Sequence, residues 1–290
     1  MIVLNLIARL PFFVLYRLSD CLFIVTAYII RYRRQVVLDN LRHAFPDESD
    51  TYIRQLARGF YRNFCDLIVE TIKLPRMTAD DMRKRVTVIN GEQVRHYLSQ
   101  GQTLLGAAGH QCNWEWVPGA TLVNGIAVDS VYKPLHNPSS ERVMQQIRSQ
   151  FGAYLIPMNR LPREMVKRRY IPRIIALVAD QMPNIPEAAY WTNFFNRDTP
   201  FFPGTERLAR SQQLPVFYLD LIRNRRGYYT ATFILLAAPP YVDLPYGEIL
   251  NRYRDQLTET ILKQPSNWLW SHKRWKHHRE EYPKINTKLE

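Results

Sequence analysis

Between residues 86 and 263, short apolar runs with strand character alternate with runs of helical spacing. Alternation of this kind is typical of α/β folds, in which helices cover a mostly parallel sheet. Upstream, the sequence predicts two helices within residues 35–74, separated at Pro46. We therefore expect one α/β domain over residues 35–290. Its strand-like runs are 86–90, 103–108, 127–132, 153–157, 174–179, 216–222 and 228–235, and its helix-like runs are 91–101, 140–151, 205–211 and 245–263.

Residues 2–30 are strongly apolar but are interrupted by Arg9, Pro11, Arg17 and Asp20. A simple spanning helix needs about 20 predominantly apolar residues, so the interruptions argue against one. A cleaved signal peptide also fits poorly, because the first positive charge comes at Arg9 and no small-residue cleavage site follows.

On a helix with about 100° per residue, the polar residues of this segment fall within an arc of about 120°. We therefore expect an uncleaved membrane anchor over residues 1–34, lying in or obliquely entering the bilayer, with its polar stripe against the body of the protein. The alternative is a buried hairpin of two core helices. Arg31, Arg33 and Arg34 follow the apolar run and predict a cytoplasmic body. The stripe comprises Asn5, Arg9, Arg17, Asp20, Arg31 and Arg34.

The net charge of +13 favours an anionic partner, either a membrane surface, an acidic protein or substrate, or a nucleic acid. The 17 Tyr, 13 Phe and 6 Trp favour the membrane, because rings with a polar edge suit the lipid–water boundary. The three cysteines lack a pairing pattern and indicate reduced thiols in the cytosol. No Cys/His spacing typical of a zinc site is present in the sequence.

The stretch TLLGAAGHQCNWEW carries the candidate chemistry. A buried strand ends at Gly109, so His110 is expected at its carboxyl end, where α/β folds place their sites. Asn113 is expected to cap a helix that begins at Trp114, which would bring Glu115 onto the ring of His110. A neutral imidazole oriented by a carboxylate can accept a proton from a hydroxyl. Backbone amides at the Asn113 helix start would stabilise the oxyanion.

No serine adjoins His110, so the substrate's own hydroxyl would be the nucleophile, attacking an acyl thioester without a metal or organic cofactor. A histidine and a glutamate five positions apart are more often structural than catalytic. Two further alternatives are Cys112 as a nucleophile and a metal bound by His110, Glu115 and Asp180.

The chain resembles the lipid A biosynthesis acyltransferase family over nearly its whole length. The resemblance rests on the order and spacing of RRQVVLDNLRHAFPD, NGEQVRHYLSQGQTLLGAAGHQCNWEW, VYKPLHN, VADQ and PSNWLWSHKRWKHHR. It implies acyl transfer from acyl carrier protein to a lipid A precursor at the cytoplasmic face of the bacterial inner membrane. One departure is Asn196, because the family usually has glycine after the paired phenylalanines.

The resemblance implies further site residues. The family's His-x4-Asp/Glu motif falls on His110 and Glu115. The arginine that follows a strand in the wider acyltransferase group falls on Arg160, which would bind phosphate. The family's Asp-Gln pair falls on Asp180 and Gln181, which would contact the acceptor.

The basic and aromatic segment WLWSHKRWKHHR is expected to lie on anionic headgroups or to dock the acidic carrier protein, unless its tryptophans pack in the core. Three alternatives to the lipid A reading remain. They are acylation of a lysophospholipid, aminolipid or glycolipid; a non-catalytic binder of lipid or carrier protein; and a nucleic-acid binder, against which the apolar N-terminus argues.

Overall fold

A seven-stranded sheet forms the centre of the protein in the computed structural model, which describes residues 2–183 and 185–282. Five neighbouring strands run parallel, and β9 pairs antiparallel with β8 and parallel with β1. This confirms the predicted α/β fold with a mostly parallel sheet. The strand order is β1 (Val86–Ile89), β9 (Tyr228–Ala237), β8 (Val216–Arg225), β2 (Leu104–Ala108), β5 (Ile174–Val178), β3 (Val128–Tyr132) and β4 (Tyr154–Pro157).

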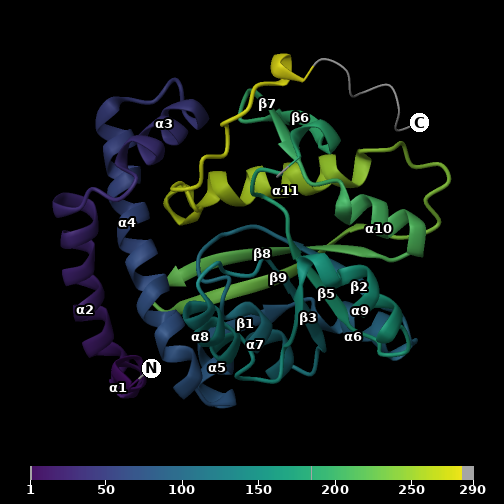
Figure 1. Cartoon of the computed structure of the whole chain (residues 1–290), viewed down its shortest axis with the longest axis horizontal. Coiled ribbons are helices and arrows are strands. Elements are labelled where there is room, and N and C mark those ends of the chain that lie inside the picture. The colour runs from purple at the N-terminus through teal and green to yellow at the C-terminus, as the bar shows by residue number, and fades with distance from the viewer. Residues whose placement is uncertain (1, 184, 283–290) are drawn as a thin grey trace.

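Helices cover both faces of this sheet (Figure 1). One buried cluster joins the sheet to α3 (Arg34–Ala44), α4 (Asp50–Lys73), α9 (Leu161–Lys167), α10 (Gly204–Gln212) and α11 (Glu248–Lys263). The opposite cluster joins it to α5 (Ala79–Arg85), α6 (Gly91–Ser99), α7 (Val117–Val123) and α8 (Pro138–Arg148). Six of the seven strands contribute to both clusters because successive side chains point to opposite faces, whereas β1 contributes Val86 and Val88 to the second cluster alone.

Some elements were not predicted. The helix α5 precedes β1, and the helix α9 follows β4, where the sequence had indicated no helix. A hairpin of β6 (Tyr190–Phe194) and β7 (Arg197–Phe201) lies apart from the main sheet. Its two turn residues, Phe195 and Asn196, have φ of 51° and 59°. Asparagine tolerates this left-handed conformation better than most residues, which accounts for Asn196 where the family usually has glycine.

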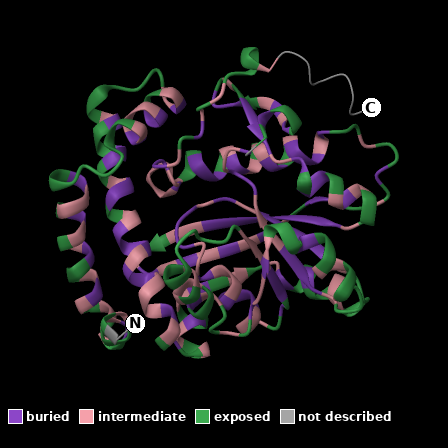
Figure 2. Cartoon of the chain, in the orientation of Figure 1, coloured by how far each residue is buried: buried purple, intermediate pink, exposed green. Residues whose placement is uncertain are grey.

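The N-terminal segment forms α1 (Ile2–Arg9), α2 (Phe12–Ile24) and a π-helical turn at Val25–Ile29, and it packs along α4 (Figure 1). Phe12–Ile29 is long and apolar enough to cross a membrane, and 22% of its residues are buried. Its exposed apolar side chains include Phe13, Ile24 and Ile29. Figure 2 shows exposed residues along the helix that packs beside α4. The proposed division into an anchor over 1–34 and a domain over 35–290 remains our proposal, and residues 283–290 lie outside the described residues.

The prediction that the polar stripe faces the body of the protein is wrong for most of the stripe residues. Arg9, Arg17 and Arg34 are exposed, whereas Leu15 and Ser19 face the body. Of the stripe, Asp20 makes an ion pair with the body, 2.7 Å from Arg226. The helix breaks at Pro11 and changes pitch in the π-helical turn, so one continuous helical wheel does not describe it.

The tryptophans of the basic and aromatic C-terminal segment pack in the core, as the alternative expected, whereas Lys273 and Lys276 are exposed. Trp268 and Trp270 are 2% and 0% exposed, and Arg274 is 0% exposed. Trp275 is half-buried against Phe194 and Trp268. Large rings bury more apolar area than any other side chain, so the core retains them even beside basic residues.

Candidate active site

His110 and Asp180 meet at the carboxyl edge of the sheet. The parallel strands β2 and β5 are in register at Ala108 and Val178, so the two residues that follow each strand lie side by side. The Nδ1 atom of His110 is 2.6 Å from Oδ1 of Asp180, and the backbone N–H of His110 donates to Oδ2 at 2.7 Å. Asp180 is buried, and the ring of His110 is 18% exposed.

The lone pair of the imidazole ring therefore lies on Nε2 of His110. A proton on Nδ1 is required for its hydrogen bond to the carboxylate, which fixes the tautomer. Gln181 places its side-chain nitrogen 3.2 Å from this Nε2. The ring of Trp114 lies edge-on to the imidazole, with 5.0 Å between centroids. These contacts leave His110 able to accept a proton at Nε2.

The charge of Asp180 is stabilised where it is buried. Burial alone would raise its pKa, but the adjacent charge of His110 and hydrogen bonds from His110 and the Trp268 indole hold the pKa below its ordinary value. Asp180, which we expected to contact the acceptor, instead lies behind the ring of His110. The carboxylate is thus ionised and acceptor-only at neutral pH.

Glu115 does not occupy the expected position on His110. Its two oxygens accept from Nε and Nη2 of Arg148 at 2.8 and 2.6 Å, and one also accepts from the Trp114 indole. The reason is local, because residues 114–116 form a turn and helix α7 begins only at Val117. The turn directs Glu115 toward α8, while the neighbouring strand brings Asp180 closer to His110.

Asn113 closes this turn and faces the interior. Its Oδ1 accepts from the backbone N–H of Trp116 at 3.2 Å, and its amide donates to the buried Glu70 at 2.6 Å. The N–H groups of Gln111 and Cys112 donate to Gly109 and Asn267. The N–H groups of Gln111, Cys112 and Trp116 are therefore engaged within the fold, and an oxyanion site on the remaining amides of this turn stays a prediction.

A cavity of about 520 Å³ lies between the sheet and α7, and both His110 and Glu115 line it. Residues from Ile174 to Val178 of β5 line its wall, so the cavity extends over about 13 Å at a rise of about 3.3 Å per residue. Small side chains create the space, and most of the rest of the lining is apolar. The small residues are Gly106, Ala108, Ser130 and Ala176, and apolar neighbours include Val117, Val128, Ile174, Leu219, Leu221 and Phe233.

Sequence reasoning did not identify Arg148 as a site residue. It lies at the end of α8 with its charge against Glu115, and it lines the cavity. Helical periodicity gives no sign that such a residue faces a site. The predicted Arg160 instead ends a 3-10 turn and is exposed, two residues after Met158 in the cavity wall.

The two alternatives to a histidine base lose support. Cys112 is buried, and burial raises the pKa of its thiol, so it is not a ready thiolate. A metal on His110, Glu115 and Asp180 does not match the contacts, since Glu115 pairs with Arg148. Within residues 2–183 and 185–282, no three His, Cys, Asp or Glu side chains are grouped as a metal site would need.

The profile of one protein family, described as bacterial lipid A biosynthesis acyltransferase, matches residues 1–277. The chain belongs to this family, and the protein is an acyltransferase of lipid metabolism. Among solved structures, it is similar to the 1-acyl-sn-glycerophosphate acyltransferase PlsC from Thermotoga maritima, with 15% identity and a TM-score of 0.39. That match covers 88% of this chain and 97% of the other. A search of curated proteins found no match.

Proposed function

We propose that the enzyme transfers a fatty acyl chain from acyl carrier protein to a hydroxyl of a lipid A precursor. The observation that carries this proposal is the His110–Asp180 pair beside an elongated apolar cavity. The cavity would hold the acyl chain, because burying a hydrocarbon chain against apolar walls is favourable. The family membership supports a lipid acceptor.

In the proposed step, Nε2 of His110 takes the proton of the acceptor hydroxyl as its oxygen attacks the thioester carbonyl. The new ester C–O bond forms and the C–S bond breaks. The proton then passes from His110 to the thiolate that leaves. Asp180 stabilises the imidazolium in between, and Gln181 would shift from Nε2 as the hydroxyl arrives.

Arg148 is proposed to bind an anionic group of the acceptor or of the donor's phosphopantetheine. Two of its nitrogens are held by Glu115, which leaves the N–H groups of Nη1 for a phosphate oxygen. In this arrangement Glu115 orients Arg148 rather than His110. Arg160 would contact the acidic carrier protein, since it is exposed close to the cavity wall.

The decisive assay incubates the purified protein with acyl carrier protein or coenzyme A thioesters and with candidate acceptors, and detects products by mass spectrometry. Candidate acceptors are a lipid A precursor, a lysophospholipid, an aminolipid and a glycolipid. We expect the acylated lipid A precursor from the carrier-protein donor. Product on another acceptor would reassign the substrate, and donor binding without product from any acceptor would favour a non-catalytic binder.

His110→Ala should abolish transfer, and His136→Ala provides a matched control because this second histidine also lines the cavity. Loss in the first variant and retention in the second would support the base role. Equal activity of His110→Ala and the wild type would exclude it.

We also propose that the enzyme acts at the cytoplasmic face of the inner membrane, with α1 and α2 on or in the bilayer. The exposed apolar residues of α2 support this, as do the exposed arginines beside them. Phe13→Asp should weaken sedimentation with anionic vesicles, whereas Val242→Asp, at an exposed valine outside this segment, should not. Equal sedimentation of the two variants would place the membrane contact elsewhere.

A further inference from the structure

The active-site loop, residues 109–113, is held by a segment more than 150 positions away in the sequence. We call residues 265–275 the C-terminal clamp. The backbone N–H of Leu269 donates to the carbonyl of His110 at 3.1 Å, and that of Cys112 donates to Asn267 at 2.9 Å. Gln111 forms an antiparallel bridge with Trp268. The clamp therefore fixes the backbone on which His110 stands.

The clamp also reaches Asp180 through a side chain. The indole N–H of Trp268 donates to Oδ2 of Asp180 at 2.7 Å. The same oxygen accepts from the backbone of His110, and the other oxygen contacts the ring. Three donors thus surround a carboxylate that is 2% exposed, and Trp268 supplies the one that His110 does not.

We propose that Trp268 is a positioning residue for acyl transfer, because its indole N–H fixes the carboxylate of Asp180 in the orientation that holds His110. This inference rests on the proposed base role of His110. Trp268 is not one of the residues that line the substrate cavity, and it acts through Asp180.

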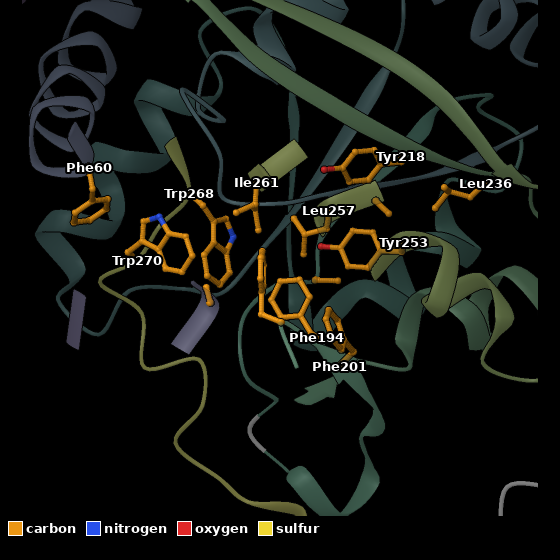
Figure 3. Close-up of a cluster of buried hydrophobic side chains, with 14 of the residues drawn as sticks. Phe60, Phe194, Phe201, Tyr218, Leu236, Tyr253, Leu257, Ile261, Trp268 and Trp270 are labelled. Carbon is orange, nitrogen blue, oxygen red and sulfur yellow. The ribbon is translucent and has the colours of Figure 1, made fainter. Parts of the chain in front are cut away.

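The indole has little freedom to move, which suits this role. Its ring lies edge-on to Trp270 at 4.7 Å between centroids and to Phe194 at 5.9 Å (Figure 3). The clamp is itself held from outside, since the amide of Asn40 donates to the carbonyls of Trp270 and His272 at 2.7 Å each. A residue packed this way keeps its donor aimed at one point.

The same N–H also acts electrostatically on His110. Its positive end points at the carboxylate and raises the local potential in a buried site, which disfavours a proton on His110 at Nε2. Removing the N–H should therefore favour the imidazolium form of His110. This effect separates a positioning role from simple packing.

Trp270 provides a matched control for the experiment. It belongs to the same ring cluster and is 0% exposed, but its indole N–H donates to the carbonyl of Pro265 at 2.6 Å. Trp268→Phe and Trp270→Phe each remove one buried indole and its donor. Only the first removes a contact with the His110–Asp180 pair.

We expect Trp268→Phe to lower kcat by about tenfold with little change in KM for the donor, since a hydrogen bond to a charged group is lost. The acid limb of its pH–rate profile should move to higher pH, and so should the titration of His110 followed by NMR. Trp270→Phe should retain the wild-type profile. Identical titration of His110 in wild type and Trp268→Phe, or equal shifts in both variants, would overturn the proposal.

Replacing Trp268 by benzothienylalanine covers the case in which Trp268→Phe does not fold. Sulfur takes the place of the N–H while the ring size is kept, so the same shift is expected, and an unchanged His110 titration would again overturn the role. The NMR titration needs no turnover. A wild type without transfer activity would therefore refute the proposed function and leave the test of Trp268 readable.

Discussion

The two faces of the central sheet are packed very differently, although alternate residues of the same strands form them. On one face Leu105 and Ala107 lie in a cluster filled by rings of α11, the β6–β7 hairpin and the C-terminal clamp (Figure 3). On the other face Gly106 and Ala108 leave a cavity of about 520 Å³. We call these the filled face and the hollow face.

The difference separates two tasks. The filled face provides dense packing and holds Asp180 through Trp268, so it supports both stability and the orientation of His110. The hollow face leaves space for a ligand. The residues that line this space make fewer van der Waals contacts, because a void provides no partner atoms. His110 stands at the edge where the two faces meet, with Asp180 behind it and the cavity in front.

The largest expected effect comes from substituting the two carboxylates near His110 one at a time, because Asp180 and Glu115 should have different roles. Asp180→Asn should lower kcat by about 10³- to 10⁴-fold, because the amide favours the wrong tautomer of the imidazole. Glu115→Gln should mainly raise KM, because it loosens Arg148 and leaves the imidazole in place. Steady-state kinetics with both substrates varied would measure the split.

Equal losses of kcat in the two variants would contradict the separate roles of Asp180 and Glu115. They would mean that Glu115 acts on the chemical step as well, as the sequence motif alone suggested. A control is Glu141→Gln, since this partly buried carboxylate of α8 contacts Tyr132 and Gln145. That variant should keep both kinetic constants near the wild-type values.

The sequence predicted the sheet, its strands and His110, because each depends on local periodicity or on a strand end. It could not predict which carboxylate meets His110. Glu115 is close in sequence, but Asp180 is close in space, since parallel pairing aligns the ends of β2 and β5. Arg148 and Trp268 were missed as site residues for the same reason, because their contacts cross the fold.

The hydrophobic N-terminus shows a second limit of sequence reasoning. The apolar segment was recognised, but the face that it turns to the body was not. Pro11 and a π-helical turn change the direction of the side chains, and neither effect enters a regular helical wheel. For residues 268–279 the sequence left a surface and a core position open, because the charges suggested the first and the rings the second. The buried rings of Trp268 and Trp270 determine where this segment packs.

Truncating a large residue should cost more stability on the filled face than on the hollow face. Ile249→Ala, at a fully buried position of α11, should lower the free energy of unfolding by about 2–5 kcal/mol. Leu219→Ala should cost less, because Leu219 already borders the cavity and has fewer contacts to lose. Urea unfolding in detergent would compare them, and a larger loss for Leu219→Ala would contradict the difference in packing.

Enlarging a small residue should reduce stability on the filled face and reduce activity on the hollow face. Ala107→Leu should lower the free energy of unfolding by about 1–3 kcal/mol, because the filled face has no room. Ala176→Leu should change stability little but reduce transfer of long acyl chains more than short ones, because its side chain enters the cavity. A panel of donors of different chain length would measure this, and an unchanged chain-length profile would place the acyl chain elsewhere.

The smallest effect concerns two buried carboxylates whose pKa values shift in opposite directions. The pKa of Asp180 is lowered, as described above. That of Glu70 is raised by burial, despite hydrogen bonds from Tyr229 and Asn113 beside the hollow face. The lowered pKa of Asp180 adds stability above the unfolded-state pKa of about 3.9, and this stability is lost as the pH falls through the folded-state pKa. The raised pKa of Glu70 adds stability below the unfolded-state pKa of about 4.3, and this stability is lost as the pH rises through the folded-state pKa.

The two amide variants should therefore diverge as pH increases from 3.5 to 7. Asp180→Asn should become progressively less stable than the wild type, because the wild type gains an ionised, hydrogen-bonded carboxylate. Glu70→Gln should become progressively more stable than the wild type, because it avoids the charge that burial disfavours. Urea midpoints measured across this range would show slopes of opposite sign. Parallel slopes would mean that both carboxylates share one electrostatic environment, and the contrast between the two faces would then be one of packing alone.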